Sequence, residues 1–342
     1  MKGTMQALVY EGPWQMPLRE VPVPEVGADE MIVRVHTVGV CGSDVHGYKG
    51  TTGRRKPPII MGHEFSGTVA AVGENVKEYY MGDPVVVTPL LTCGSCENCL
   101  KGFPNQCQNR SALGVNLNGA YAEYVKVAKK MVFPIPSGMS WEQAALVEPL
   151  AVAMHAVNLM PLQLLDAVVI LGVGTIGLLT ILAARLKGAG KIMAVDPSVH
   201  RLEVAQKVGA DVIINPTSED AVEAVKKQTK GKGSPAVIEA VGINQTAKQS
   251  LLMARNGGNI VWIGNNDPEV TINMQQIVTR ELTVKGAYGF NDEFVASIEC
   301  IHSKRIDPTI LIEKRASLEE GTEIIDDLAR GKSEWIKVML TP

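Results

Sequence analysis

The second half of the chain alternates strand-like and helix-like segments, and no other feature constrains the fold as strongly. Helical patterns cover residues 176–187 and 199–208. We expect short strands, all rich in β-branched residues, over 167–171, 191–195, 212–214, 236–239, 259–263 and 282–285. Strands that alternate with helices form a parallel sheet covered by helices on both faces. The sequence therefore predicts a doubly wound α/β domain over residues 151–286.

A glycine motif lies where the first of these strands turns into the first helix. It reads Gly172-Val173-Gly174-Thr175-Ile176-Gly177. In such a motif the first glycine permits a tight turn, the second lets the backbone approach a pyrophosphate, and the third lets helix and strand pack closely. The N-terminus of the helix attracts the phosphates. We therefore expect a Rossmann domain that binds a dinucleotide through Gly172, Gly174, Thr175, Ile176 and Gly177.

An acidic residue, Asp196, closes the next strand about 20 residues after the motif. At that position a carboxylate can accept hydrogen bonds from both hydroxyls of a ribose, and it repels a 2′-phosphate. The predicted cofactor is therefore NAD rather than NADP. Arg201 follows five residues later, and two interpretations remain open for it. It lies along the adenosine, or it belongs to a solvated helix face.

The first third of the chain has the pattern of an irregular β domain. Residues 30–38 alternate apolar and polar side chains, and residues 68–72 and 84–88 are β-branched. Glycine and proline separate these segments. The pattern becomes helical after Ser140, which has capping-box spacing to the glutamine three residues later. The apolar segment that follows, 144–158, predicts a helix interrupted at its proline.

The last segment, 287–342, is too short to form a good core of its own. We expect helices and a final strand over 292–302, 318–330 and 335–340. These elements should return to pack on the first part of the chain. Because 342 residues exceed the size at which one core keeps growing, we expect two domains, 1–150 with 287–342 and 151–286.

Composition excludes two classes of partner. The net charge of -3 and the pI near 6.1 give no electrostatic reason to bind nucleic acid or an anionic membrane. The first residues do not resemble a secretory signal, and no stretch approaches the roughly 18 apolar residues of a membrane span. We therefore expect a cytoplasmic protein that acts on a small molecule. In a reducing compartment, six cysteines of which four are clustered indicate metal binding rather than disulfides.

The four clustered cysteines, Cys93, Cys96, Cys99 and Cys107, have the spacing C-x2-C-x2-C-x7-C. Thiolates at these intervals can wrap one tetrahedral ion, and four of them leave Zn²⁺ no open position. An iron–sulfur cluster is the alternative, because the first three cysteines match a ferredoxin run. However, seven residues separate the third cysteine from the fourth, instead of three. The pattern therefore predicts a structural zinc.

A second set of metal ligands is dispersed along the chain: Cys41, His63, Glu64 and Glu148. Taken singly, each could be an ordinary structural residue. A cysteine, a histidine and one carboxylate would neutralise Zn²⁺ and leave a fourth position for solvent or substrate, as in a catalytic site. If both carboxylates bound at once, the net negative charge would oppose alkoxide formation. One of them should therefore exchange with solvent or stand behind the ligands, and the sequence does not select which.

Together these residues resemble the zinc-containing medium-chain dehydrogenase/reductase family, which includes alcohol, sorbitol and threonine dehydrogenases. The resemblance covers essentially the whole chain, and its motifs are 41–46, 62–67 with Gly73 and Val76, Gly82-Asp83, the four cysteines, 119–124, Glu148-Pro149 and the glycine motif. It implies a GroES-like catalytic domain split in sequence around the nucleotide domain, with the active site in the cleft between them. It also implies that Cys41 and His63 bind the catalytic zinc, and that Glu64 or Glu148 completes the ligand set. Asp44 would support a ligand from behind.

The same resemblance bears on substrate and assembly. Glu148-Pro149 stands where alcohol dehydrogenases carry a third cysteine ligand, and in this the chain is similar to the polyol dehydrogenase branch. The sorbitol enzymes of animals place an arginine-tyrosine pair near the substrate, whereas this chain has Tyr288-Gly289-Phe290, which argues against sorbitol itself. Family likeness also implies a homo-oligomer, a dimer or tetramer joined through the nucleotide domains.

The expected reaction is a zinc-dependent, NAD-linked oxidation of a secondary alcohol, in a small polyol or sugar alcohol, to a ketone. The substrate hydroxyl would bind the open zinc position and become more acidic. Ser43 would accept its proton and pass it, through the nicotinamide ribose, to His46, while hydride moves to the nicotinamide ring. The ordinary alternatives are a turn hydroxyl for Ser43 and a surface imidazole for His46.

Other functions stay open. A loop with Lys49, Arg54, Arg55 and Lys56 is either a solvated cationic edge or, if it faces the cleft, a site for a phosphorylated polyol. Sugar-alcohol phosphates, threonine and butanediol are the alternative substrates. Outside enzymes, the chain could be an NAD-binding zinc redox sensor, although a sensor has no need of the full set of ligands and relay residues. A zinc-free quinone reductase of the same superfamily lacks these ligands.

Overall fold

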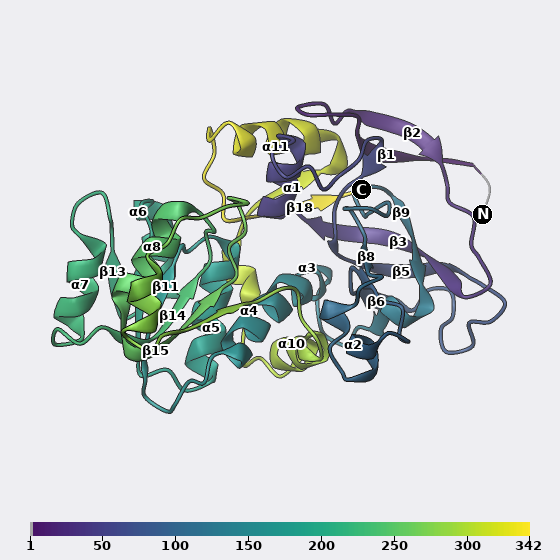
Figure 1. Cartoon of the computed structure of the whole chain (residues 1–342). Helices are drawn as coiled ribbons and strands as arrows, with labels where there is room; N and C mark the ends of the chain where they lie inside the picture. The colour runs from purple at the N-terminus through teal and green to yellow at the C-terminus, as the bar shows by residue number, and fades with distance from the viewer. Residues whose placement is uncertain (1–2) are drawn as a thin grey trace. The chain divides into compact units, whose positions relative to one another are not determined.

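The computed structural model describes residues 3–342, which Figure 1 colours along the chain. The chain divides into two compact units. Unit 1 comprises Met1–Glu148 and Phe294–Pro342, and unit 2 comprises Pro149–Glu293. From the sequence we expect the boundaries between the catalytic and nucleotide domains after residues 150 and 286. These boundaries stay a prediction.

Unit 2 is built on a parallel sheet. Its strands are β11 (Ala167–Leu171), β12 (Lys191–Val195), β13 (Val212–Ile214), β14 (Ser234–Glu239), β15 (Ala254–Trp262) and β16 (Thr283–Gly286). They lie in the order β13-β12-β11-β14-β15-β16, and every neighbouring pair is parallel. This is the strand order of a doubly wound dinucleotide-binding sheet. The predicted Rossmann fold is therefore confirmed.

Helices cover this sheet on both faces. They are α5 (Thr175–Leu186), α6 (Val199–Lys207), α7 (Ala221–Gln228), α8 (Asn244–Met253) and the short α9 (Met274–Val278). The right-handed crossovers that lead from β11 through β12 to β13 put α5 and α6 on one face of the sheet. The chain then crosses to β14 and continues to β16 in the opposite direction, which puts α7 and α8 on the other face. In agreement, α5 contacts α6 and α7 contacts α8. Strand residues such as Val169, Val195 and Val237 are buried between the layers.

Unit 1 is centred on β3 (Glu30–Gly39). The other strands of its main sheet are β5 (Glu64–Val72), β6 (Pro84–Val87), β9 (Tyr124–Ala128), β10 (Val132–Pro134), β17 (Ile312–Ser317) and β18 (Lys337–Thr341). They follow the order β10-β6-β5-β3-β18-β17, and β9 also pairs with β3. β18 comes from the C-terminal segment, and its pairing with β3 sets Met339 opposite Gly39. A segment too short for its own core thus completes the sheet of the first third. The predicted irregular β-rich domain is confirmed.

Smaller elements complete unit 1. A second sheet has the order β2-β1-β4, and a two-stranded sheet pairs β7 with β8 antiparallel; these strands are β1 (Thr4–Tyr10), β2 (Leu18–Pro22), β4 (Ile59–Ile60), β7 (Leu90–Leu91) and β8 (Ser111–Ala112). The α-helices are α1 (Gly42–Tyr48), α2 (Glu97–Leu100), α3 (Trp141–Ala145), α10 (Glu293–His302) and α11 (Gly321–Ala329). Single 3₁₀ turns cover Pro104–Gln106, Lys129–Met131, Pro308–Leu311 and Leu318–Glu320.

The helix predicted over 144–158 is in fact two helices. The capping box at Ser140 is present, since the backbone N–H of Gln143 donates to its Oγ at 3.1 Å. α3 ends at Ala145 with Leu146 as its C-cap, and α4 (Val147–Leu159) begins directly after this cap. Pro149 therefore lies in the first turn of α4, where the missing N–H would have no helical partner. The proline accompanies a new helix start instead of interrupting a helix.

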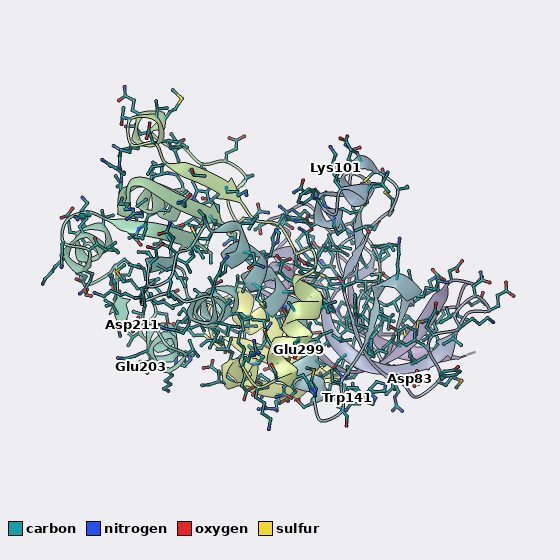
Figure 2. The ribbon with its side chains drawn as sticks, turned by 90° about the horizontal axis from the view of Figure 1, so that it is seen from below. Asp83, Lys101, Trp141, Glu203, Asp211 and Glu299 are labelled. Carbon is teal, nitrogen blue, oxygen red and sulfur yellow. The ribbon has the colours of Figure 1, made fainter. Side chains whose placement is uncertain are left out.

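Charged side chains lie at the surface of each unit. Figure 2 labels Glu203 and Asp211 of unit 2 and Lys101 and Glu299 of unit 1, all of them exposed. The buried side chains of both units are mostly apolar, so the few buried charges stand out. Among residues 3–342, no helix combines the length and the apolar character needed to cross a membrane.

Candidate metal and nucleotide sites

Cys41 lies between β3 and α1, a helix that the sequence analysis did not predict. We expected strands and turns there, because α1 is short and its two glycines weaken the helical pattern. Cys41 has an extended backbone (φ -94°, ψ 147°) and is the N-cap of the helix. The helix carries Ser43, Asp44 and His46. The candidate ligand and the candidate proton-relay residues therefore share one element.

The structure brings Cys41, His63 and Glu64 together. Their ligand atoms all lie within 4.8 Å of one another. The pairing of β3 with β5 causes this, because Gly39 at the end of β3 lies opposite Glu64 at the start of β5. His63 is 9% exposed and Glu64 is 1% exposed. A thiolate, an imidazole and a carboxylate that converge in a nearly dry place fit a zinc ion.

Asp44 stands behind His63. Its Oδ1 lies 3.5 Å from Nδ1 of His63, which has no closer hydrogen-bond partner in residues 3–342. Arg55 Nη2 donates to Oδ1 of Asp44 at 2.7 Å, and the hydroxyl of Tyr121 donates to Oδ2 at 2.8 Å. Burial by itself would raise the pKa of Asp44, but these three neighbours hold the pKa well below its ordinary value. An ionised carboxylate at Nδ1 orients the imidazole and leaves Nε2 for a metal.

Glu64 is paired with Lys337, a residue that the sequence analysis missed. Lys337 is 1% exposed, and its Nζ lies 2.5 Å from Oε2 of Glu64 and donates to the carbonyl of Val40 at 3.2 Å. The available signal was a single lysine in the apolar strand near the C-terminus. This cation offsets the charge of Glu64, so the site carries less negative charge than its candidate ligands alone would give it.

Glu148 is buried in the first turn of α4, close to this cluster but not in it. In the described part of the chain, the candidate ligand atoms of this cluster that lie within 4.8 Å of one another belong to Cys41, His63 and Glu64. Burial raises the pKa of Glu148 to about 7; His63 opposes the rise and Glu64 adds to it. Both carboxylates remain candidates for the third ligand.

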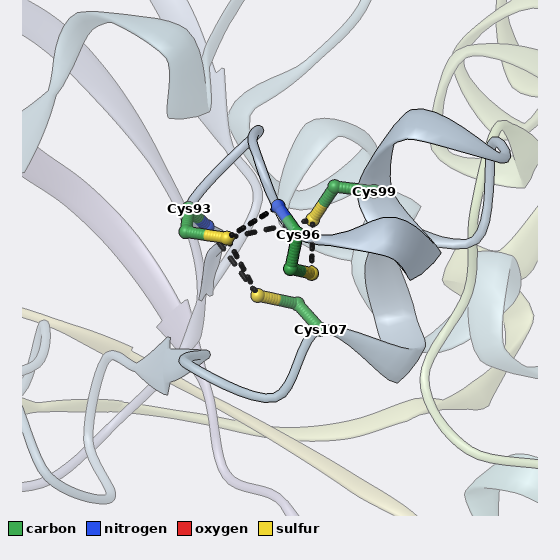
Figure 3. A group of neighbouring side chains, drawn as sticks. All are labelled: Cys93, Cys96, Cys99 and Cys107. Atoms are coloured by element: carbon green, nitrogen blue, oxygen red, sulfur yellow. Dashed lines mark hydrogen bonds between the residues drawn. The ribbon is translucent and has the colours of Figure 1, made fainter.

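Residues 93–107, which we call the lobe, carry four cysteines whose sulfur atoms converge toward a common point (Figure 3). Sγ of Cys93 lies 3.5 Å from Cys107 and 4.0 Å from Cys99, and Cys96 lies 3.5 Å from Cys99. Zn–S bonds of about 2.3 Å give a tetrahedron with S–S edges of about 3.8 Å. Backbone N–H groups of Ser95 and Cys96 lower the pKa of Cys93 to about 5. The donor set therefore fits a zinc ion with four thiolate ligands.

The glycine motif forms the turn from β11 into α5. Gly172 has a left-handed backbone (φ +84°), and a Cβ on Gly177 would lie 1.9 Å from the carbonyl oxygen of Gly172. Gly174 is the N-cap of α5, and a Cβ there would meet no atom within 4 Å. Thr175 and Ile176 begin the helix. The backbone thus requires the first and third glycines, and the second leaves the helix N-terminus open to a phosphate.

Asp196 is buried just after β12 and binds the glycine turn. Its Oδ2 accepts a hydrogen bond from the backbone N–H of Val173 at 2.9 Å, and its Oδ1 accepts one from Ser198 at 2.9 Å. Each oxygen keeps a second lone pair for a ribose hydroxyl. Arg201 is partly exposed on α6, and its Nε is buried without a hydrogen-bond partner in residues 3–342. An adenosine beside it would satisfy that group.

Ser43 and His46 lie one turn apart on α1. The exposed hydroxyl of Ser43 donates to Sγ of Cys41 at 3.4 Å. Burial and the nearby Lys49 lower the pKa of His46, which is partly exposed. The imidazole is therefore neutral at physiological pH and can accept a proton.

The cationic loop differs from our expectation at one position. Arg54 and Lys56 are exposed and Lys49 is partly exposed, as a solvated edge requires, but Arg55 is only 7% exposed. Arg55 is neither part of a solvated edge nor free to bind a phosphate, so both interpretations of the loop are wrong for it. Its guanidinium donates hydrogen bonds to Asp44 and to backbone carbonyls.

Comparison with known proteins identifies the class. The family model described as "Alcohol dehydrogenase GroES-like domain" matches residues 27–137, and the one described as "Zinc-binding dehydrogenase" matches residues 175–303. These ranges fall on the β-rich first part and on the Rossmann sheet. Fold, ligand sets and matches together define a dehydrogenase of the zinc-binding alcohol dehydrogenase type.

The relatives place the chain more closely. It is 35% identical to sorbitol dehydrogenase of Bacillus subtilis (strain 168), over 99% of this chain and 97% of the relative. It is 33% identical to D-arabitol-phosphate dehydrogenase of Enterococcus avium, over 99% and 98%. A protein designated a zinc-binding dehydrogenase from Sinorhizobium meliloti 1021, with NADP bound, superposes with a TM-score of 0.93 at 33% identity, over 99% and 100%. The chain belongs to the zinc-containing medium-chain dehydrogenase/reductase family and is an alcohol-type oxidoreductase.

Proposed function

We propose that this enzyme oxidises a secondary alcohol of a small polyol or sugar alcohol to a ketone, with one catalytic and one structural zinc and with NAD. The observation that carries the proposal is the convergence of Cys41, His63 and Glu64 within 4.8 Å, backed by the ionised carboxylate of Asp44. That the relatives named above act on sorbitol and on D-arabitol phosphate supports a polyol-like substrate.

In this proposal, Cys41 and His63 hold the catalytic zinc, and Glu64 or Glu148 completes the set. Zinc bound there supplies Lewis acidity, which lowers the pKa of a coordinated hydroxyl. Lys337 would offset the negative charge of Glu64, so that this carboxylate adds little net charge to the site. The four cysteines of the lobe hold the structural zinc.

Ser43 and His46 carry the proton in the proposed mechanism. The hydroxyl of Ser43 lies 3.4 Å from Sγ of Cys41, which would hold the metal, and this hydroxyl would accept the proton of the substrate. His46, neutral at physiological pH, receives the proton. His46→Ala should slow turnover about tenfold or more near pH 6 and much less near pH 9, where solvent base replaces the imidazole. An unchanged pH profile of kcat would remove His46 from the relay.

NAD is the proposed cofactor, bound by the glycine turn with Asp196 at the adenosine ribose and Arg201 along the adenosine. The carboxylate of Asp196 repels a 2′-phosphate. The Sinorhizobium relative nevertheless has NADP bound, so the preference of this chain needs measurement. The ratio of kcat/KM for NAD to that for NADP should exceed one, and Asp196→Ala should lower it.

A phosphorylated polyol is the second candidate substrate. The exposed Arg54 and Lys56 and the partly exposed Lys49 can bind a phosphate, and one relative acts on D-arabitol phosphate. The deciding experiment is an NAD-reduction screen with zinc retained, over sugar alcohols, their phosphates, vicinal diols and threonine. We expect the highest kcat/KM for a sugar alcohol. A clear preference for the phosphate esters selects the second candidate, and no alcohol-dependent NADH signal contradicts both.

We further propose a homo-oligomer joined through unit 2. β16 is an edge strand of the parallel sheet, and Met274 and Val278 just before it are exposed. An exposed strand edge beside apolar side chains is suited to pairing with a second copy. Light scattering on the purified protein should give a dimer or tetramer; a monomer at micromolar concentration would contradict this.

A further inference from the structure

We propose that Arg55 is a positioning residue for the catalytic metal site. It holds the carboxylate of Asp44 behind His63. It also holds Ser43 beside Cys41. This inference rests on the proposed function, since positioning has a purpose only if Cys41 and His63 bind zinc.

The guanidinium of Arg55 binds separate segments of unit 1. Nη2 donates to Oδ1 of Asp44 at 2.7 Å, and Nη1 donates to the carbonyl of Ser43 at 2.9 Å. Nε donates to the carbonyl of Gly114 at 2.8 Å. Nη2 also lies 3.5 Å from Oγ of Ser43, which in turn donates to Sγ of Cys41. One buried side chain thus ties the loop before β4 to α1 and to the loop after β8.

Asp44 depends on this contact. The carboxylate has no solvent exposure, and its Oδ1 is shared between Arg55 at 2.7 Å and His63 at 3.5 Å. A buried carboxylate without a counter-charge is strongly unfavourable. Arg55 supplies that charge before any metal binds. The oxygen that faces His63 is therefore the oxygen that Arg55 fixes in place.

The sequence of α1 makes room for the guanidinium. Gly47 lies inside the helix, where glycine is unfavourable. A Cβ at this position would lie 2.7 Å from both Cδ and Nη1 of Arg55. Glycine thus lowers the intrinsic stability of α1 at the position where the guanidinium of Arg55 packs against the helix. Gly47→Ala should displace Arg55 without changing any group of the site.

A lysine cannot replace these bonds. Arginine presents five N–H donors in a rigid plane, whereas lysine is a point charge with three. An ammonium at position 55 can pair with Asp44 but cannot also bind the carbonyls of Ser43 and Gly114. Arg55→Lys therefore separates two tasks, the neutralisation of Asp44 and the holding of Ser43.

The test measures zinc retention in the absence of substrate. Purified holoenzyme is dialysed against a series of chelator concentrations, and zinc per chain is measured by atomic emission. The zinc of the four cysteines is the internal reference. Arg55→Met should weaken the catalytic zinc about 10- to 100-fold, the usual effect of losing a group that supports a metal-bound histidine. Arg54→Met, which changes the exposed neighbour, is the matched control and should retain zinc as the wild type does.

A double variant tests the route of the effect. If Arg55 acts through Asp44, then Arg55→Met should add little to the zinc loss already caused by Asp44→Asn. The double variant also removes both buried charges, so it should fold even if Arg55→Met does not. Additive losses of zinc affinity would overturn the proposal, as would normal retention in a folded Arg55→Met.

Arg55→Lys supplies the readout that a merely structural role would not change. We expect near-normal zinc retention with a lower kcat and little change in KM, because Asp44 stays neutralised while Ser43 is released. Wild-type kcat in this variant would overturn the positioning of Ser43. If the wild type itself retains only the zinc of the lobe, the proposed function fails and this inference fails with it; normal zinc in every variant overturns the inference and leaves the proposed function standing.

Discussion

The two candidate metal sites of unit 1 are assembled in opposite ways. The lobe draws its four ligands from residues 93–107, and local turns and backbone N–H groups bring the sulfur atoms together. The Cys41 site draws its ligands from distant segments and needs buried ions behind them, with Arg55 at Asp44 and Lys337 at Glu64. A local site should therefore depend on its ligands alone, and a dispersed site should depend on every charge packed behind it.

The largest effect is expected at the open site. Cys41→Ser removes a proposed zinc ligand, so the Lewis acidity that would lower the pKa of the substrate hydroxyl should be lost. We expect kcat/KM to fall on the order of 10³-fold, the equivalent of several kcal/mol of transition-state stabilisation. Zinc analysis should show that the lobe keeps its ion. Activity near that of the wild type would contradict a catalytic metal at Cys41.

The second-largest effect is expected at the buried ion pair of Lys337 and Glu64. Lys337→Met leaves Glu64 without its counter-charge, which should lower the free energy of unfolding by about 3–5 kcal/mol. Urea titration of the metal-depleted protein measures this difference. In the double variant with Glu64→Gln, both charges are gone and most of the stability should return. A single variant as stable as the wild type would show that the dispersed site does not depend on its supporting ions.

The sequence predicted those parts of the molecule that are encoded locally. The strands of the parallel sheet follow from apolar runs, the glycine turn from its motif, and the lobe from four cysteines in one segment. Lys337 was missed and Arg55 was grouped with the other cations of its loop, because the partners of both residues are set by sheet register and loop packing, which act over long separations. Lys337 meets Glu64 only because β18 pairs with β3 and β3 pairs with β5. From the sequence alone, Arg55 is indistinguishable from its neighbour Arg54, which is exposed in the structure.

The lobe should respond differently from the open site. Cys107→Ser removes a buried thiol of the four-cysteine cluster, so the proposed structural zinc should be lost. A cost of a few kcal/mol would lower Tm by roughly 5–10 °C in a chain of this size. Below the transition, kcat should stay close to that of the wild type. If kcat falls as far as in Cys41→Ser, the distinction between a structural and a catalytic site is wrong.

Another buried carboxylate, Glu293 in unit 2, lies outside both metal clusters and serves as a reference. Its Oε1 lies 3.0 Å from Nδ1 of His155 and accepts a hydrogen bond from Asn158 at 3.1 Å, and its Oε2 accepts one from the backbone of Asn291 at 2.8 Å. Burial by itself would raise the pKa of Glu293, but these bonds outweigh it and lower the pKa to about 2.

The smallest effect is expected from Glu293→Gln. The folded pKa lies below the ordinary value of 4.5, so the ionised group stabilises the fold fully above about pH 4.5, and this contribution is lost as the pH falls toward 2. The variant should be less stable by about 1–2 kcal/mol at neutral pH, and the difference should shrink in acid. Urea titrations at several pH values measure it. Zinc retention should match the wild type, since this carboxylate supports no metal ligand. A stability difference that stays constant down to acid pH would show that Glu293 stabilises the fold by its shape rather than by its charge. Glu293 would then no longer serve as a charged reference for Glu64 and Asp44.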